Sequence, residues 1–267
     1  HIQLSKLNGT LDNISFIKDT LRANIDLTVK DRSGFKLERL KTKFRFTPQI
    51  MELASLDLRT AKSRIGNYYA MKYADFNKDF SEYIDKVVMD ARFTNAKINS
   101  DDIAYFAPEL KNLKRNIDIS GKYLGTVSDF TVSNLYTRIG NKTNLSGSLS
   151  MKGLPDINTT QIYLNKGVIS TNYNDLVSFI PALKNITEPN LAELGNIIYR
   201  GNFKGTIKNF ATSGVFSTAL GGLTTDISLK LPSKGDPTYT GNIETTRFNI
   251  GKFLNTKNLG LVNFKGG

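Results

Sequence analysis

Strict alternation of apolar and polar residues dominates this sequence and constrains its fold more than any other feature. Clear examples are residues 25–30, 44–47, 56–59, 117–120, 145–151 and 227–231. Successive side chains of a β-strand point to opposite faces, so each run predicts a strand with one apolar and one wet face. Gly, Asn and Pro turns separate the runs, and we expect about fifteen strands. The sequence therefore predicts a mainly β protein.

Helical signals are few and short. One covers 75–89, where Phe76, Phe80, Tyr83 and further apolar residues follow a three-four spacing. Two more helical segments begin at Asp102 and Asp175. A carboxylate at a helix start accepts hydrogen bonds from exposed backbone N–H groups, so we interpret both aspartates as helix caps.

An internal repeat organises the chain. Residues 102–112 resemble 175–185, and downstream 121–130 resemble 201–210 around a Gly-x-x-x-Gly-Thr turn. The repeated unit reads as a strand, a short helix and several further strands. We therefore expect residues 1–267 to form a single repeat-built β domain, a fragment of a longer protein. Its repeat units would be 92–165 and 166–245, with each strand contacting only its neighbours.

Composition argues against an enzyme. The chain has no cysteine, and its single histidine is His1. Cysteine nucleophiles, thiolate metal sites and histidine-based triads therefore lack their residues, and we expect no catalytic residue, no metal and no cofactor. A Ser-x-x-Lys spacing at Ser15 and Lys18 has no Lys-Thr-Gly partner. The Gly-x-x-x-Gly-Thr turns are followed by strands, whereas a phosphate loop precedes a helix.

The net charge of +12 allows an anionic partner. However, the lysines are spread evenly along the expected strands, there is no tryptophan, and no basic run reaches five residues. This pattern is typical of a solvated sheet face and does not predict nucleic-acid binding.

The apolar strand faces are the candidate functional surface. Two alternatives remain open from alternation alone: a closed core under a second layer, or a groove that holds an apolar ligand. The candidate groove-lining residues are Ile25, Leu27, Val29, Phe44, Phe46, Leu56, Leu58, Ile117, Ile119, Leu145, Leu149, Ile162, Leu164, Ile227 and Leu229.

Several segments occur in an order that resembles a known family. They are 60–66, 102–110, 121–130, 153–156, 201–210 and 216–221. Together they resemble the TamB proteins of the translocation and assembly module in Bacteroidetes-type bacteria, within the wider AsmA-like superfamily. The resemblance implies a long, curled, antiparallel-rich repeat sheet with a taco-like apolar groove and a few short helices.

The same resemblance implies a non-enzymatic function in outer-membrane biogenesis. Such a protein lies in the periplasm, is anchored in the inner membrane through an N-terminal segment that we do not find here, and partners an outer-membrane barrel of the Omp85 type. It carries phospholipid acyl chains along its groove or aids outer-membrane protein assembly and secretion. The alternative is a structural or protein-binding β-repeat with a closed core and no lipid transport.

Overall fold

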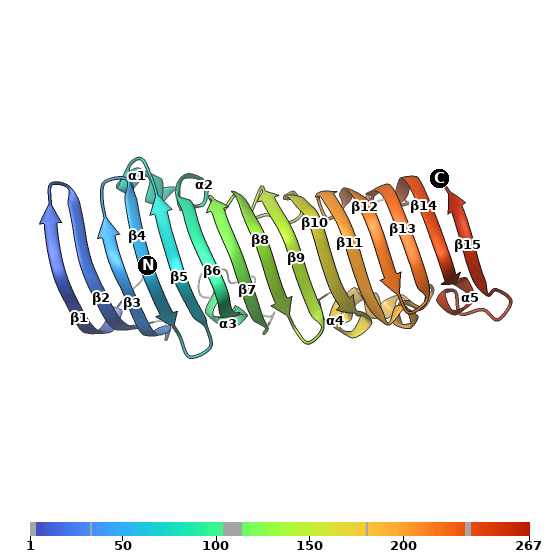
Figure 1. Ribbon diagram of the computed structural model, residues 1–267, viewed down its shortest axis with the longest axis horizontal. Coiled ribbons are helices and arrows are strands. Elements are labelled where there is room, and N and C mark those ends of the chain that lie inside the picture. Colours follow the sequence, from blue (N-terminus) through green and yellow to red (C-terminus); the bar gives the residue numbers. More distant parts are fainter. Residues whose placement is uncertain (1–3, 33, 104–113, 180, 233–235) are drawn as a thin grey trace. The chain divides into compact units, whose positions relative to one another are not determined.

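The computed structural model describes residues 4–32, 34–103, 114–179, 181–232 and 236–267 (Figure 1). The chain forms two compact units, His1–Thr137 and Arg138–Gly267. Within each unit every strand is hydrogen-bonded to its neighbours in sequence. The mainly β, antiparallel prediction with a few short helices is confirmed, and so is the expectation of about fifteen strands, because the described residues contain β1 to β15. The taco-like curl stays a prediction.

The first unit is built from antiparallel strands with short helices at their ends. Its strands are β1 (Leu4–Ile17), β2 (Thr20–Asp31), β3 (Lys36–Phe46), β4 (Ile50–Arg59), β5 (Arg64–Lys72), β6 (Val88–Asn99), β7 (Asn116–Gly125) and β8 (Asp129–Ile139). Its described helices are α1 (Phe76–Ser81), α2 (Tyr83–Lys86) and α3 (Ser100–Ile103). The last residues of β8 already belong to the second unit.

The second unit repeats this plan. Its remaining strands are β9 (Thr143–Lys152), β10 (Gln161–Asn172), β11 (Asn196–Gly205), β12 (Asn209–Thr218), β13 (Gly221–Lys230), β14 (Thr238–Asn249) and β15 (Leu261–Gly266). Its described helices are α4 (Tyr173–Phe179), the 3-10 helices η2 (Pro181–Asn185) and η3 (Leu191–Leu194), and α5 (Ile250–Phe253).

β-Bulges keep the apolar residues on one face where the sequence alternation breaks. In β4, Leu53 is opposite Phe44 and Leu58 is opposite Leu40, although Leu58 follows Leu53 by an odd number of positions. The register shifts between these pairs, and Ser55 in β4 has a positive φ of 52°. One inserted residue reverses the alternation and returns the apolar side chains to the same face.

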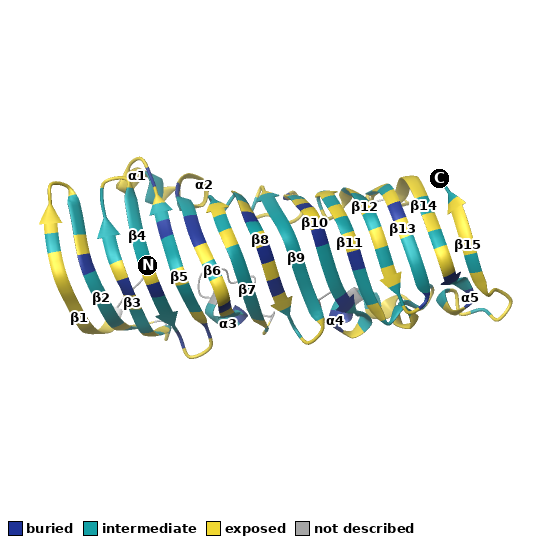
Figure 2. Ribbon diagram, viewed as in Figure 1, coloured by how far each residue is buried: buried dark blue, intermediate teal, exposed yellow. Residues whose placement is uncertain are grey.

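Complete burial occurs at a few positions in and beside the strands. Among the described residues, the largest fully buried side chains are those of Val87, Thr160 and Ser100, which flank β6 and β10, and Ala70 and Ala91 are buried within β5 and β6. In strands such as β8 and β12, exposed positions alternate with buried or half-buried ones (Figure 2). No second sheet covers either face within a unit, as far as the described residues go.

The single helix expected over 75–89 is wrong in extent. Asp75 does cap a helix, because its side chain accepts a hydrogen bond from the Lys78 backbone N–H at 2.9 Å. However, Glu82 leaves the helical conformation and separates α1 from α2. Met89 then pairs with Met71 and Gly125 inside the sheet. The three-four apolar spacing therefore extends beyond the helices into residues that belong to β6.

The caps expected at Asp102 and Asp175 are also wrong. Asparagine fills that position in both repeats: Asn99 accepts from the Asp101 N–H, and Asn172 accepts from the Asp175 N–H, each at 2.9 Å. Both helices begin before the aspartates that were expected to cap them. Residues 104–112 of the first repeated motif lie outside the described residues.

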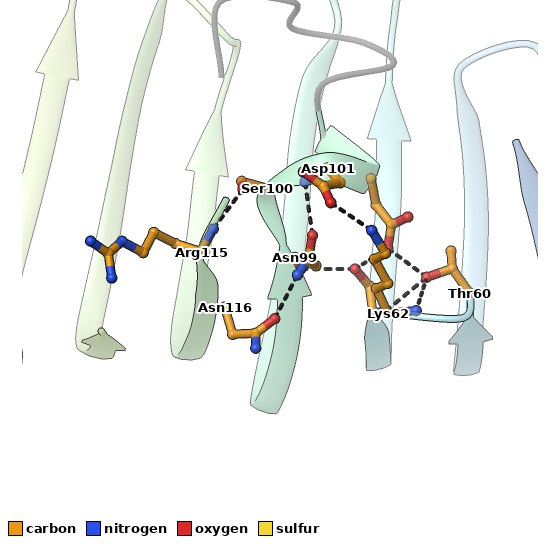
Figure 3. Close-up of polar contacts among 9 residues, drawn as sticks. Thr60, Lys62, Asn99, Ser100, Asp101, Arg115 and Asn116 are labelled. Carbon is orange, nitrogen blue, oxygen red and sulfur yellow. Dashed lines mark hydrogen bonds and ion pairs between the residues drawn. The ribbon is translucent and has the colours of Figure 1, made fainter. Parts of the chain in front are cut away.

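Each of the two aspartates instead connects its own helix, α3 or α4, to a neighbouring hairpin turn. Asp102 accepts hydrogen bonds from the hydroxyls of Thr60, at 2.6 Å, and Ser63, in the β4–β5 turn. Figure 3 shows this region, with Thr60 and Lys62 of the turn beside Asp101 of α3. In the second unit, Asp175 accepts from the Lys142 N–H at 2.8 Å and the Thr143 hydroxyl at 2.9 Å. Each repeat thus uses one carboxylate as a tether between a helix and the turn beside it.

Candidate functional site

The second unit contains a large apolar groove with a volume of about 1100 Å³. Its walls and floor come from β9 to β15, and α4, η3 and α5 contribute side chains at the strand ends. The lining residues are Leu145, Leu149, Ile162, Leu164, Ile169, Thr171, Leu176, Leu194, Ile197, Tyr199, Phe203, Phe210, Thr212, Phe216, Thr218, Leu223, Thr245, Phe248, Ile250, Phe253, Val262, Asn263 and Phe264.

Strand register gathers these side chains into rows that cross the sheet. Leu149 is opposite Leu164, which is opposite Phe203. A second row joins Leu145, Ile169, Tyr199 and Phe216 in the same way, and Leu223 extends it on β13. Because each row uses one residue per strand, the sheet presents a continuous apolar band rather than isolated patches.

Aromatic rings make up much of the floor. Phe203 and Phe210 stack with centroids 4.8 Å apart, and Tyr199 and Phe216 lie 4.6 Å apart. These ring pairs join β11 to β12, where cross-strand aromatic contacts stabilise a sheet beyond the area they bury. The floor of the groove is therefore largely aromatic where β11 meets β12.

Short helices cover one end of the groove. Leu176 of α4, Leu194 of η3 and Phe253 of α5 all face into it. The Asn190 N–H donates to the Phe253 carbonyl at 2.7 Å, and the Ala219 N–H donates to the Leu194 carbonyl at 2.9 Å. These backbone bonds hold the segment after α4 against α5 and the β12–β13 turn.

The polar atoms that line the groove already have partners. Thr171 shares a hydrogen bond with Thr143 at 2.8 Å, and Thr212 shares one with Tyr199 at 2.7 Å. Asn263 accepts from the Arg247 N–H at 2.7 Å. No charged side chain is among the described lining residues. A groove of this kind is suited to apolar matter, which it would hold through contact area.

The structure brings together four of the predicted lining residues in this groove: Leu145, Leu149, Ile162 and Leu164. Ile227 and Leu229 lie on β13, opposite Thr212 and Phe210, but outside the groove lining.

The other nine predicted residues belong to the first unit. They are Ile25, Leu27 and Val29 on β2, Phe44 and Phe46 on β3, Leu56 and Leu58 on β4, and Ile117 and Ile119 on β7. Ile25 and Val29 border two smaller hollows lined mainly by polar residues. None of these nine residues is among those that line the groove of the second unit.

The aromatic floor was missing from the sequence-based set. The pattern was present, since Tyr199, Gly201 and Phe203 alternate on β11 and Phe210, Thr212 and Phe216 follow the same period on β12. Glycine and threonine interrupt the apolar positions there, so aliphatic alternation alone did not detect these strands. A search for alternating aromatic and glycine residues finds them.

The first unit contains ion pairs between side chains on neighbouring strands, and one of them is centred on Glu52. Arg45 and Tyr68 both donate to Glu52, at 2.6 and 2.8 Å. Burial opposes ionisation of Glu52, yet the hydrogen bonds from Tyr68 and Arg45 hold its pKa below the ordinary value. Burial, together with the bond to Glu52, raises the pKa of Tyr68 to about 12. Both groups are fixed in one protonation state near neutral pH, which is typical of structural pairs.

Asp57 is the centre of a second charged cluster. Arg59 donates to it at 2.8 and 2.7 Å, and Arg64 and Arg39 lie 3.8 and 3.9 Å away. The hydrogen bond from Arg59 lowers the pKa of Asp57 and outweighs partial burial, and the charges of Arg64 and Arg39 add to the effect. This carboxylate is a poor general base because it is held strongly in the ionised form.

Comparisons with known proteins leave the family open: no family model, curated protein or solved structure matches the chain. In the part of the chain that the structure describes, no helix is long and apolar enough to cross a bilayer. Among the same residues, His, Cys, Asp and Glu do not gather in threes at a distance suited to a metal ion.

Proposed function

We propose that this protein is a non-enzymatic conduit for lipid in the bacterial envelope, and that phospholipid acyl chains lie in the apolar groove of the second unit. The proposal includes a periplasmic location, an inner-membrane anchor elsewhere in the protein, an Omp85-type outer-membrane partner and a role in outer-membrane biogenesis. It also includes a taco-like curl of the sheet that encloses the chain in transit. The resemblance to the TamB family supports these points.

The groove itself is the observation that supports the proposal most directly. It offers about 1100 Å³ of space with no charged side chain among its described lining residues. A sixteen-carbon acyl chain loses roughly 13 kcal/mol of burial when it enters water, at ~0.8 kcal/mol per CH₂. An apolar track without polar anchors offsets that cost and holds no single position of the chain, so the lipid remains free to slide.

A second candidate function is protein binding by a structural β-repeat. It is supported by β1, whose apolar side chains Leu7, Leu11 and Phe16 are 55%, 53% and 72% exposed. Large apolar side chains that are exposed in this way form a surface against which another polypeptide can pack. This candidate requires no lipid in the second unit.

The experiment compares Leu149→Glu with Ser148→Glu on the same strand. Leu149 lines the groove and Ser148 points to the opposite face of β9, so both variants add the same charge at adjacent positions. Lipid that co-purifies with each variant is measured by mass spectrometry of organic extracts, and folding is measured as the melting temperature.

The conduit predicts that Leu149→Glu folds, because its carboxylate reaches the open groove and hydrates, but retains far less lipid than Ser148→Glu. A collapse of folding in Leu149→Glu alone would show a closed core, since an unpaired buried charge costs several kcal/mol. Equal lipid content in two folded variants would also contradict the conduit.

A further inference from the structure

Two glycines face each other between the aromatic residues of the groove floor. Gly201 on β11 is directly opposite Gly214 on β12. A Cβ atom built on either residue would collide with the backbone of the other strand. It would also lie 2.6 Å from the Tyr199 hydroxyl at Gly201, and 2.8 Å from the ring at Gly214. The two backbones therefore lie too close for a side chain on either glycine, and the hollow above them is filled by a neighbouring side chain.

The side chain of Tyr199 occupies this hollow. Tyr199 is 6% exposed and forms part of the groove lining. The hydroxyl donates to the Asn202 carbonyl at 2.7 Å, and Thr212 lies 2.7 Å from the same oxygen. Because a tyrosine hydroxyl carries one proton, Thr212 must be the donor in the second bond. The ring is thus held at its tip as well as at its backbone.

The corresponding place in the first unit is built differently. When 121–130 is aligned with 201–210, Ile119 matches Tyr199 and Asn134 matches Gly214. Asn134 has a positive φ of 51°, whereas Gly214 does not. A long aromatic side chain over a facing glycine pair is therefore a feature of the second unit, where the groove is.

We propose that Tyr199 sets the depth of the groove and so selects slender, unbranched apolar chains over bulky ring systems. This inference rests on the proposed function, because it assumes that an apolar ligand occupies the groove. With the ring in place the floor is level and accommodates a flat, extended chain. Without it, the hollow above Gly201 and Gly214 opens and admits a fused-ring hydrocarbon.

The test measures two ligands on the same proteins: hexadecanoate by isothermal titration calorimetry, and pyrene by its fluorescence. The readout is the ratio of their dissociation constants. Tyr199→Ala should shift this ratio by about tenfold or more in favour of pyrene, since small changes in pocket volume shift discrimination by roughly 10–200-fold. Tyr199→Leu, a filler of intermediate size, should give an intermediate ratio.

Two further variants separate the effect of groove depth from a general loosening of the sheet. Tyr199→Phe keeps the ring and loses only the hydroxyl bonds, so its ratio should stay closer to that of the wild-type protein than to that of Tyr199→Ala. Ile119→Ala removes bulk at the matching position outside the groove and should leave the ratio unchanged. An unaltered ratio in folded Tyr199→Ala and Tyr199→Leu overturns the inference while hexadecanoate binding upholds the proposed function. Failure of the wild-type protein to bind hexadecanoate overturns both.

Discussion

Two adjacent carboxylates on α3 have different partners, so replacing each of them by alanine gives a variant and its control. Asp102 accepts hydrogen bonds from Thr60 and Ser63, whereas Asp101 forms an ion pair with Lys62 at 2.5 Å. We expect Asp102→Ala to lower the free energy of unfolding by about 1–3 kcal/mol, because a half-buried turn loses its charged acceptor.

Asp101→Ala serves as the control for that experiment. Its side chain is 38% exposed, so the loss of its ion pair should cost at most about 1 kcal/mol. Chemical denaturation of both variants measures the difference. Equal effects of the two substitutions would mean that the tether to the β4–β5 turn contributes nothing specific.

Acid should weaken the first unit partly through Asp57. Its pKa in the folded protein lies below the ordinary value of 3.8, chiefly because of Arg59. A lowered pKa stabilises the fold above that ordinary value, and the stabilisation disappears as the pH falls through the folded pKa. We expect the stability advantage of the wild-type protein over Asp57→Asn to shrink between about pH 5 and pH 2. An advantage that stays constant across this range would contradict the assignment.

At the scale of elements, asparagine caps define where the short helices begin. Asn99, Asn172 and Asn249 each end a strand and accept a backbone N–H from the following helix. We expect Asn172→Ala to cost about 0.5–2 kcal/mol, and Asn172→Asp to restore most of it, since aspartate accepts the same bond. Thermal denaturation of both variants checks this. Equal melting temperatures for Asn172→Ala and the wild-type protein would exclude the cap.

The strands were predictable because one face of each is wet. In β2, Ile25, Leu27 and Val29 alternate with polar residues. The face of a strand that contacts water favours polar residues and the other face favours apolar ones, so the sequence itself shows the alternation. The length of the helix after β5 was not predictable in this way. Met89 satisfies helical spacing and strand alternation equally well, and only its pairing with Met71 decides.

The groove was predictable only in its aliphatic part. Leu149 and Leu164 belong to runs of alternating aliphatic residues, and they do lie opposite each other. Tyr199 and Phe216 come together through the register of β11 and β12, which the sequence of either strand alone does not contain. The tether of Asp175 to Lys142 and Thr143 depends in the same way on a turn 32 or 33 residues away.

At the scale of the whole molecule, the division into two units predicts local unfolding. Leu56 is 6% exposed in the first unit, and Leu56→Ala should destabilise that unit by about 2–5 kcal/mol. Because a repeat sheet transmits stability between neighbouring strands, peptides from β3 to β5 should lose hydrogen-exchange protection while peptides from β11 to β13 keep it. A uniform loss of protection along the chain would show a single cooperative unit.

Pairing between successive strands also determines how the protein can fold. Within each unit every strand bonds to the one before it, and most of these pairs are joined by short turns; the longest connection is residues 173–195, between β10 and β11. Proteins dominated by such local contacts fold faster than sheets with distant pairings. A chain that emerges gradually, from a ribosome or through a membrane channel, can therefore add one hairpin at a time. No finished strand has to wait, exposed and prone to aggregate, for a partner that has yet to arrive.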